Sequence, residues 1–155
     1  MLGEDKKVKV YGAMQTILDE LLQLTIIIYS SNSKILEILN ESNIKFKKII
    51  STNSLDKFKE ILTKNGIDIV LIDSAILKQI YHLIKYDKCI IAIIDNPDAK
   101  TEVELVQKGV SAIILNNILR EFLETAIYLG YERKKREKLM LNLTQSLNKL
   151  QSHYE

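Results

Sequence analysis

Short apolar runs alternate with amphipathic segments along the middle of the chain. The runs are rich in isoleucine and valine and only a few residues long, which is typical of β-strands. Most are apolar at nearly every position, as parallel strands are when helices cover both faces of their sheet. The run at 44–50 instead alternates lysine with apolar residues, so we expect it at a sheet edge. The five expected strands are 24–29, 44–50, 67–72, 89–94 and 111–115.

The segments between these runs repeat apolar residues every three or four positions, as amphipathic helices do. Ser54 and Gly66 bracket one segment as a helix cap and a helix stop. Strand alternating with helix predicts an α/β fold with a doubly wound, five-stranded parallel sheet. The expected helices are 33–42, 54–66, 75–86, 98–109 and 117–131.

Both flanks of this core place apolar residues at alternating spacings of four and three, which is the a/d seam of a coiled coil. We expect an N-terminal amphipathic helix over 1–23, a core over 24–131 and a helical, coiled-coil extension over 132–155. The last helix is expected to run without a break from about residue 118 to 152. The side of this helix expected to face the core consists of Ile118, Phe122, Ala126 and Leu129. Its C-terminal seam consists of Met140, Leu143, Leu147 and Leu150. The N-terminal seam consists of Val10, Met14, Ile17, Leu21 and Leu24.

The composition narrows the class of protein. Of the 155 residues 46% are hydrophobic and 27% are charged, as in an ordinary globular chain. The net charge of +2 gives no argument for nucleic-acid or membrane binding. One cysteine excludes an internal disulfide, and no apolar run reaches the roughly 18 residues of a membrane span. We therefore expect a cytoplasmic protein with no membrane insertion, no metal and no cofactor.

One carboxylate stands at a position suited to chemistry. Asp73 directly follows the apolar run 67–72 in "IDIVLIDSAIL". In doubly wound sheets, ligands bind at the carboxyl ends of the strands, so Asp73 is expected at that edge. Asp73 could accept a phosphoryl group, or it could be a solvated acid that caps the helix after it.

The core, over roughly residues 24 to 130, resembles the receiver domain of bacterial response regulators in two-component signalling. The resemblance rests on the βα layout, on "VLIDS" around Asp73, and on "ELVQKGVSAIILNN" near the last strand. It implies a flavodoxin-like, receiver-type sheet. In working receivers, two acids after the first strand help to hold Mg²⁺, and an Asp after the third accepts the phosphoryl group. A hydroxyl after the fourth strand and a Lys-Pro after the fifth complete the site.

This sequence departs from that pattern at every position except Asp73. Ser30 and Ser31 stand where the two acids are expected, Ile94 stands at the hydroxyl position, and Asn116 stands in place of the lysine. Without the acids and the lysine, the charge that stabilises phosphoryl transfer is missing. The resemblance therefore implies a degenerate receiver, or pseudo-receiver, that is not an enzyme.

The leading hypothesis is a signalling module that binds a protein partner and forms a homodimer through its coiled-coil seam. One alternative is a phospho-accepting receiver that uses Asp73. The other is a binder of a small molecule or anion at the strand ends, through Ser30, Ser31 and Asn32. The basic run 132–138 is expected to be a solvated coiled-coil face rather than a nucleic-acid site.

Overall fold

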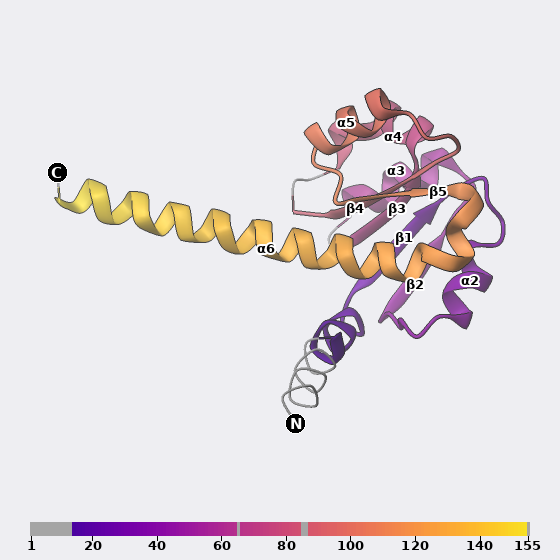
Figure 1. The fold of residues 1–155 in the computed structure, drawn as a ribbon, viewed down its shortest axis with the longest axis horizontal. Coiled ribbons are helices and arrows are strands. Elements are labelled where there is room, and N and C mark those ends of the chain that lie inside the picture. The colour runs from indigo at the N-terminus through magenta and orange to yellow at the C-terminus, as the bar shows by residue number, and fades with distance from the viewer. Residues whose placement is uncertain (1–13, 65, 85–86, 155) are drawn as a thin grey trace.

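The centre of the molecule is a parallel sheet of five strands in the order β2-β1-β3-β4-β5 (Figure 1). It is seen in a computed structural model that describes residues 14–64, 66–84 and 87–154. The prediction of a doubly wound, flavodoxin-like sheet with helical extensions is thereby confirmed. The strands are β1 Thr25–Tyr29, β2 Lys48–Ser51, β3 Ile69–Asp73, β4 Cys89–Ile94 and β5 Ala112–Leu115.

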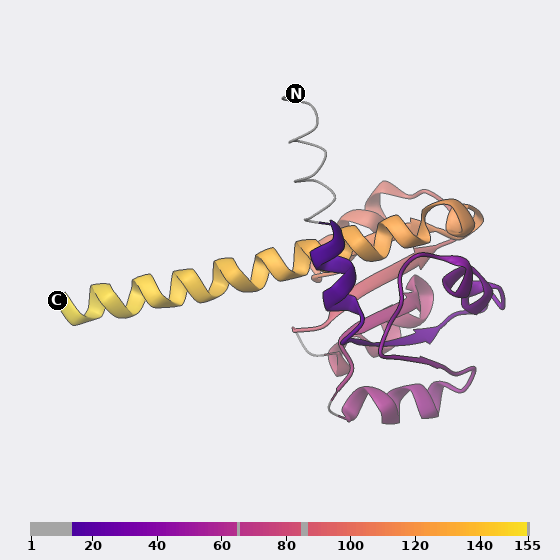
Figure 2. The ribbon, with the colours of Figure 1, turned by 90° about the horizontal axis from the view of Figure 1, so that it is seen from below.

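Helices cover both faces of the sheet (Figures 1 and 2). One face carries α2 and α6 together with the helical residues 14–21, and the other carries α3, α4 and α5. Strand side chains point alternately to the two sides, so that Leu71 belongs to the first core and Val70 and Ile72 to the second. The helices are α2 Ile35–Glu41, α3 Leu55–Thr63, α4 Ser74–Ile80, α5 Ala99–Gln107 and α6 Leu119–Tyr154, with 3₁₀ turns η1 Tyr81–Leu83 and η2 Asn116–Ile118.

The largest differences from the predicted boundaries are at the segments 44–50 and 75–86. The strand expected at 44–50 begins at Lys48, because Lys48 already pairs with Thr25, the first residue of β1. Residues 44–47 run past the beginning of β1, and Ile44 is buried against the α2 and α6 side of the core. The helix expected at 75–86 is α4 followed by η1, and positions 85 and 86 lie outside the described residues.

The face of α6 that packs on the sheet is only partly the predicted one. Leu119, Leu123 and Ile127 are buried against the sheet, whereas Phe122 and Leu129 keep 51% and 53% of their surface exposed. Ile118 and Ala126 of the predicted face are partly buried against the same core. The prediction was therefore wrong for Phe122 and Leu129, and it missed the residues that are most deeply buried.

Gly130 explains how closely α6 approaches the sheet. A Cβ atom at this position would lie 3.1 Å from the Cβ of Ala112 and 3.4 Å from Cγ1 of Ile91. Both neighbours belong to strands, so a side chain at 130 would push the helix away from β4 and β5. The glycine thus allows α6 to pack closely on β4 and β5.

The helical residues 14–21 are attached to α6 at the same point (Figure 2). Ile17 and Leu21 lie in the core, and the carboxylate of Glu20 accepts hydrogen bonds from Lys135 Nζ at 2.5 Å and from Tyr131 Oη at 2.7 Å. These two donors lower the pKa of Glu20. Met14 is exposed, and Val10 of the predicted N-terminal seam lies outside the described residues.

Candidate functional site

The carboxyl ends of the strands carry a cluster of polar side chains around Asp73. Asp73 is the last residue of β3, and Ser30 follows β1, the neighbouring strand. The parallel pairing of these two strands brings both residues to one edge of the sheet, as the sequence predicted for Asp73. Asp73 makes no side-chain cap on α4, so the capping interpretation is wrong.

Both oxygens of the Asp73 carboxylate accept hydrogen bonds from the loop after β1. Ser30 Oγ donates to Oδ1 at 2.7 Å, and the backbone N–H of Ser31 donates to Oδ2 at 2.8 Å. Ser31 Oγ donates to the same Oδ2 at 3.1 Å. Hydrogen bonds to a charged acceptor are the stronger kind, so the two serines hold the carboxylate firmly. The hydroxyl protons of Ser30 and Ser31 are thereby directed at Asp73 rather than at a ligand.

A second set of hydrogen bonds extends this network to the ends of β5 and β4. Asn32 Nδ2 donates to Asn116 Oδ1 at 2.8 Å, and Asn116 Nδ2 donates to Asp95 Oδ1 at 3.2 Å. The backbone N–H of Asn32 also donates to Ser30 Oγ at 3.1 Å. The chain from Asp73 through Ser30, Asn32 and Asn116 to Asp95 therefore joins the ends of four strands.

The structure brings most of the predicted site residues together, with one exception. Asp73, Ser30, Ser31 and Asn116 belong to one hydrogen-bonded network. Ile94, the last residue of β4, is buried in the core on the α3, α4 and α5 side and contributes no polar group.

The hydrogen-bonding role of Asn32 was not predicted. The run of polar residues after β1 was the available signal, but which of them reaches another strand depends on the path of the loop.

The site does not fit Mg²⁺ as receivers hold it. Mg²⁺ takes oxygen ligands, usually with carboxylates among them, and the residues at the two acid positions are serines that donate to Asp73. Throughout the described ranges, no group of three or more His, Cys, Asp or Glu side chains could hold a metal ion.

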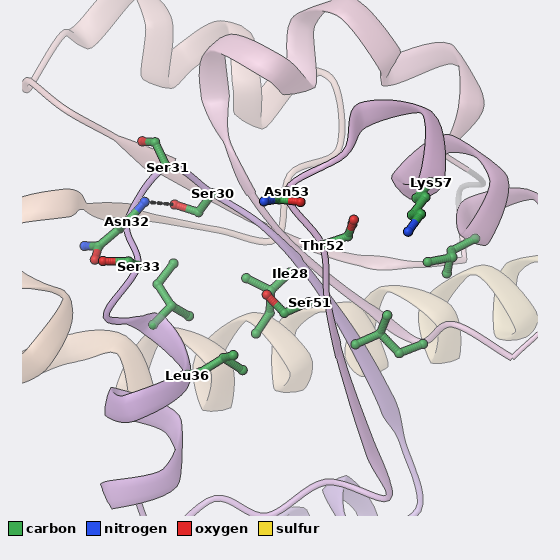
Figure 3. A pocket seen from close by; sticks show the side chains of 13 residues that line it. Ile28, Ser30, Ser31, Asn32, Ser33, Leu36, Ser51, Thr52, Asn53 and Lys57 are labelled. Atoms are coloured by element: carbon green, nitrogen blue, oxygen red, sulfur yellow. Dashed lines mark hydrogen bonds between the residues drawn. The ribbon is translucent and has the colours of Figure 1, made fainter.

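An open cleft of ≈ 700 Å³ adjoins this network beside the end of β2 (Figure 3). Ser30, Ser31, Asn32 and Ser33 line one side, and Ser51, Thr52, Asn53 and Lys57 line the other. Lys57 is the single charged side chain among the described residues that line it. Ser33, Ser51 and Asn53 form no side-chain hydrogen bonds within the described part of the chain. The cleft therefore offers unpaired donors and one positive charge.

The one cysteine is part of the core rather than of a site. Cys89 opens β4, is buried, and has a thiol pKa raised to about 11 by desolvation. A thiol with a raised pKa carries little of the thiolate that reacts as a nucleophile. No helix in the described ranges is long and apolar enough to span a membrane.

Solved structures with a similar arrangement of strands and helices include receiver domains and pilus assembly proteins. A CheY-like response regulator receiver domain protein from Methanospirillum hungatei is 16% identical, with a TM-score of 0.55 over 74% of this chain and 98% of that one. This chain has the fold of a receiver domain. Pilus assembly protein CpaE from Caulobacter crescentus is 11% identical, with a TM-score of 0.52 over 72% of this chain and 94% of that one.

A response regulator from Burkholderia pseudomallei, solved with a phosphorylated aspartic acid, calcium ion and citrate, is also similar. It is 13% identical, with a TM-score of 0.53 over 76% of this chain and 75% of that one. At such identities the likeness is one of fold alone. No protein-family model matches the sequence, and no curated protein matches it.

Proposed function

We propose that this chain is a signalling module with a receiver fold that acts through protein contacts and dimerisation and does not accept a phosphoryl group. The receiver fold supports the signalling role, since receivers signal by contacting protein partners. The residues at the strand ends support the absence of phosphoryl transfer. The long α6 supports dimerisation.

The observation that carries this proposal is the hydrogen bonding of Asp73. A phosphoryl acceptor needs a carboxylate oxygen free to attack, with positive charge nearby to stabilise the transferred group. Both oxygens of Asp73 accept hydrogen bonds from the Ser30–Ser31 segment. At the lysine position, Asn116 is neutral and is hydrogen-bonded to Asn32 and Asp95. The two positions after β1 therefore carry no carboxylate for a metal ion, and the position after β5 carries no cation for phosphoryl transfer.

Treatment with acetyl phosphate and Mg²⁺ tests this proposal directly. We expect intact-mass measurement to show no phosphorylated species of this chain, while a working receiver treated in parallel acquires one. The same treatment of Asp73→Asn is the matched control. Phosphorylation that requires Mg²⁺ and disappears in Asp73→Asn would show that Asp73 is an acceptor, and the proposal would then be wrong.

Dimerisation is supported by the distal half of α6, which projects away from the globular part (Figures 1 and 2). Met140, Leu143, Leu147 and Leu150 each keep more than half of their surface exposed. Leucines on one face of a projecting helix gain stability only when another surface covers them. A second copy of the chain offers the same seam, which makes a homodimer the simplest way to cover it.

The open cleft beside β2 supports a second candidate function, the binding of a small anionic molecule. Its lining has no carboxylate, and Lys57 supplies a positive charge that has no ion pair among the described residues. The unpaired side chains of Ser33, Ser51 and Asn53 offer hydrogen bonds to phosphate or carboxylate oxygens. The hydroxyl protons of Ser30 and Ser31 are directed at the Asp73 carboxylate, so these two side chains are not counted among the donors of this site.

Thermal unfolding with inorganic phosphate, AMP and FMN tests the cleft. Binding to the folded state raises the unfolding temperature, so we expect at least one probe to raise it by a few degrees. The rise is expected to vanish in Lys57→Gln and to persist in Lys59→Gln, because Lys59 lies on the same helix but does not line the cleft. No rise with any of the three probes, or an equal rise in Lys57→Gln, would contradict anion binding here.

A further inference from the structure

The amino-terminal edge of the sheet, opposite to the edge that carries Asp73, has a small pocket lined by three lysines. Lys88 directly precedes β4, Lys108 lies in the turn before β5, and Lys134 lies on α6. We call this space the lysine pocket; its volume is ≈ 20 Å³. The other described residues that line it are Tyr81, Ile84, Ile90 and Gly109. None of the described lining residues is an acid, so three positive charges from separate segments surround one small space.

Two of these lysines are largely buried, and their hydrogen-bonding capacity is unused. The side chains of Lys134 and Lys88 keep only 11% and 14% of their surface exposed. An ammonium group has three N–H donors, yet neither ammonium group donates a hydrogen bond to any described residue. Burying a cation costs free energy unless a charged partner and hydrogen bonds compensate it.

The acids that pair with these two ammonium groups lie beyond hydrogen-bonding distance. Glu137 Oε2 is 3.8 Å from Lys134 Nζ, and Asp87 Oδ2 is 3.9 Å from Lys88 Nζ. The carboxylate of Glu137 is closer to Arg133, at 3.4 Å. The side chains of Glu137 and Asp87 are 48% and 62% exposed, and water weakens ion pairs with such acids. Within the described part of the chain, the lysine pocket therefore has no acid at hydrogen-bonding distance.

The third lysine is held at the pocket by an aromatic ring. Lys108 Nζ lies 5.7 Å from the centroid of the Tyr81 ring, which is within the range of a cation–π contact. Gly109 has a φ of +92°, and a Cβ atom there would lie 3.3 Å from Tyr81 Oη. The glycine thus allows the turn before β5 to approach this tyrosine closely. The charge of Lys108 is added to the pocket, where like charges repel unless an anion compensates them.

We propose that Lys88, Lys108 and Lys134 bind a carboxylate group of a ligand in the lysine pocket. A volume of ≈ 20 Å³ holds little more than one water-sized oxygen. A planar carboxylate places one oxygen in such a space and keeps the other at its mouth, whereas a tetrahedral phosphate group is bulkier. The ammonium groups donate charge-assisted hydrogen bonds to the carboxylate, and these are stronger than bonds between neutral groups.

The rest of the ligand lies in an open groove of ≈ 460 Å³ that follows α6 and shares Lys134 with the pocket. Two lysines and two acids line this groove, together with Leu141 and Asn142, so the groove does not itself select an anion. The selection lies in the lysine pocket. A carboxylate is available on a free organic acid and on an Asp or Glu side chain of a protein partner. The second source rests on the proposed signalling function, whereas the carboxylate site itself does not.

Thermal unfolding in malonate tests the lysine pocket. Malonate carries two carboxylates, and each measurement is compared with sodium chloride at equal ionic strength, which screens surface charges to the same extent. Binding to the folded chain raises the unfolding temperature, so we expect a rise of a few degrees in malonate. No rise in the unaltered chain would overturn the proposal.

Variants of two lysines assign the rise to the pocket. We expect it to vanish in Lys134→Met and in Lys108→Gln, and Lys108 is exposed, so its substitution leaves the fold intact. Lys149→Gln is the matched control, because Lys149 is an exposed lysine of α6 that lines neither the pocket nor the groove. An equal rise in Lys134→Met and Lys108→Gln would overturn the proposal.

The cleft beside β2 is kept apart from this site by Lys57→Gln, which removes the cation of the cleft. In this variant we expect malonate to keep its effect and inorganic phosphate to have little effect. A malonate effect that disappears in Lys57→Gln belongs to the cleft and overturns the lysine pocket. A phosphate effect in Lys57→Gln as large as that of malonate would overturn the assignment to a carboxylate.

Stability without malonate separates a binding site from a lysine that only stabilises the fold. Lys134→Met keeps an apolar stem and removes a charge that repels the other two lysines. We expect its unfolding temperature in sodium chloride to equal or exceed that of the unaltered chain. A fall of several degrees, with malonate affecting neither chain, would show that Lys134 stabilises the fold through Glu137, and the proposal would be wrong.

Fluorescence anisotropy of a labelled peptide distinguishes the two sources of the carboxylate. The peptide carries a single glutamate among serines, and its counterpart carries glutamine instead. Binding that needs both the glutamate and Lys134 assigns the site to a protein side chain. A malonate effect without peptide binding assigns it to a free acid, and this result leaves the proposed protein contacts to other surfaces. Equal binding of both peptides would contradict recognition of a carboxylate on a protein segment.

Discussion

Replacing Leu143 and Leu147 with glutamate is expected to make the chain monomeric at concentrations where the unaltered chain is a dimer. Both leucines lie at the centre of the C-terminal seam, and each keeps more than half of its surface exposed in a single copy of the chain. In the proposed dimer they would be buried against the same residues of the second copy. The substitution replaces apolar contacts with charges that face each other across the seam.

The size of the effect follows from the buried area. Burying a leucine side chain contributes about 1.5 kcal/mol at the lower end of the usual range, and the dimer buries four of them at these two positions. Their loss amounts to roughly 6 kcal/mol, which corresponds to roughly a 10⁴-fold increase in the dissociation constant. Repulsion between the introduced carboxylates weakens association further.

Sedimentation velocity and equilibrium measure this change, and circular dichroism reports whether α6 keeps its helical content. The matched control is Asn142→Glu with Gln145→Glu, which adds the same charge to the outward positions of the same helical segment. We expect this control to remain a dimer. If both double variants dimerise as the unaltered chain does, the seam is not the interface.

The hydrophobic pattern was enough to predict the sheet. Each strand of the core is a short apolar run between polar segments, and β4 matched its predicted bounds because all six of its residues are buried. The α3 cap at Ser54 was also readable, since its side chain accepts a hydrogen bond from the Lys57 backbone N–H. These features depend on neighbouring residues, and local sequence therefore specifies them.

The pattern failed where two local solutions were equally good. In the first part of α6, a stripe through Leu119 and Leu123 competes with one through Phe122 and Leu129, and both have helical periodicity. Gly130 lies on the first stripe and allows close approach to Ala112, which decides in favour of that stripe. The presence of Gly130 in the sequence did not predict which stripe faces the core, because its effect depends on contacts with strands that are distant in sequence.

The candidate site was predictable in position but not in its bonding. The βα pattern was enough to place Asp73 at the carboxyl edge, and the resemblance to receivers implied that Ser30 and Asn116 lie near it. The hydrogen bonds that connect them depend on side-chain rotamers and on the path of the loop after β1. The sequence suggested an acid that had lost its metal ligands, whereas the structure shows an acid that both serines bind directly.

Substituting aspartate for both Ser30 and Ser31 is therefore expected to make the stability of the chain depend on Mg²⁺. Without metal, Asp73 loses two hydroxyl donors, which now lie 2.7 Å and 3.1 Å from its oxygens. It gains two carboxylates in their place. Lost hydrogen bonds to a charged group cost about 1.5–3 kcal/mol each, and like charges at this separation repel. We expect the free energy of unfolding to fall by roughly 3 kcal/mol.

Mg²⁺ is expected to restore much of that loss, because three carboxylates at one strand edge form the hard oxygen site that the serines lack. At a metal concentration about 100 times the dissociation constant, binding adds roughly 2.7 kcal/mol to stability. Urea unfolding with and without Mg²⁺ measures both effects. Ser30→Asn with Ser31→Asn is the uncharged control, and we expect it to lose stability without recovering it in Mg²⁺.

The comparison with the unaltered chain decides what the serines do. If the hydrogen bonds from Ser30 and Ser31 take the place of a metal ion at the Asp73 carboxylate, Mg²⁺ is expected to leave the stability of the unaltered chain unchanged and to stabilise only the aspartate variant. Adding Asp73→Asn to that variant then removes one of the three carboxylates and weakens the response to Mg²⁺. An unaltered chain that Mg²⁺ stabilises as strongly as the variant would show that the serines permit metal binding, and the site would then not be degenerate.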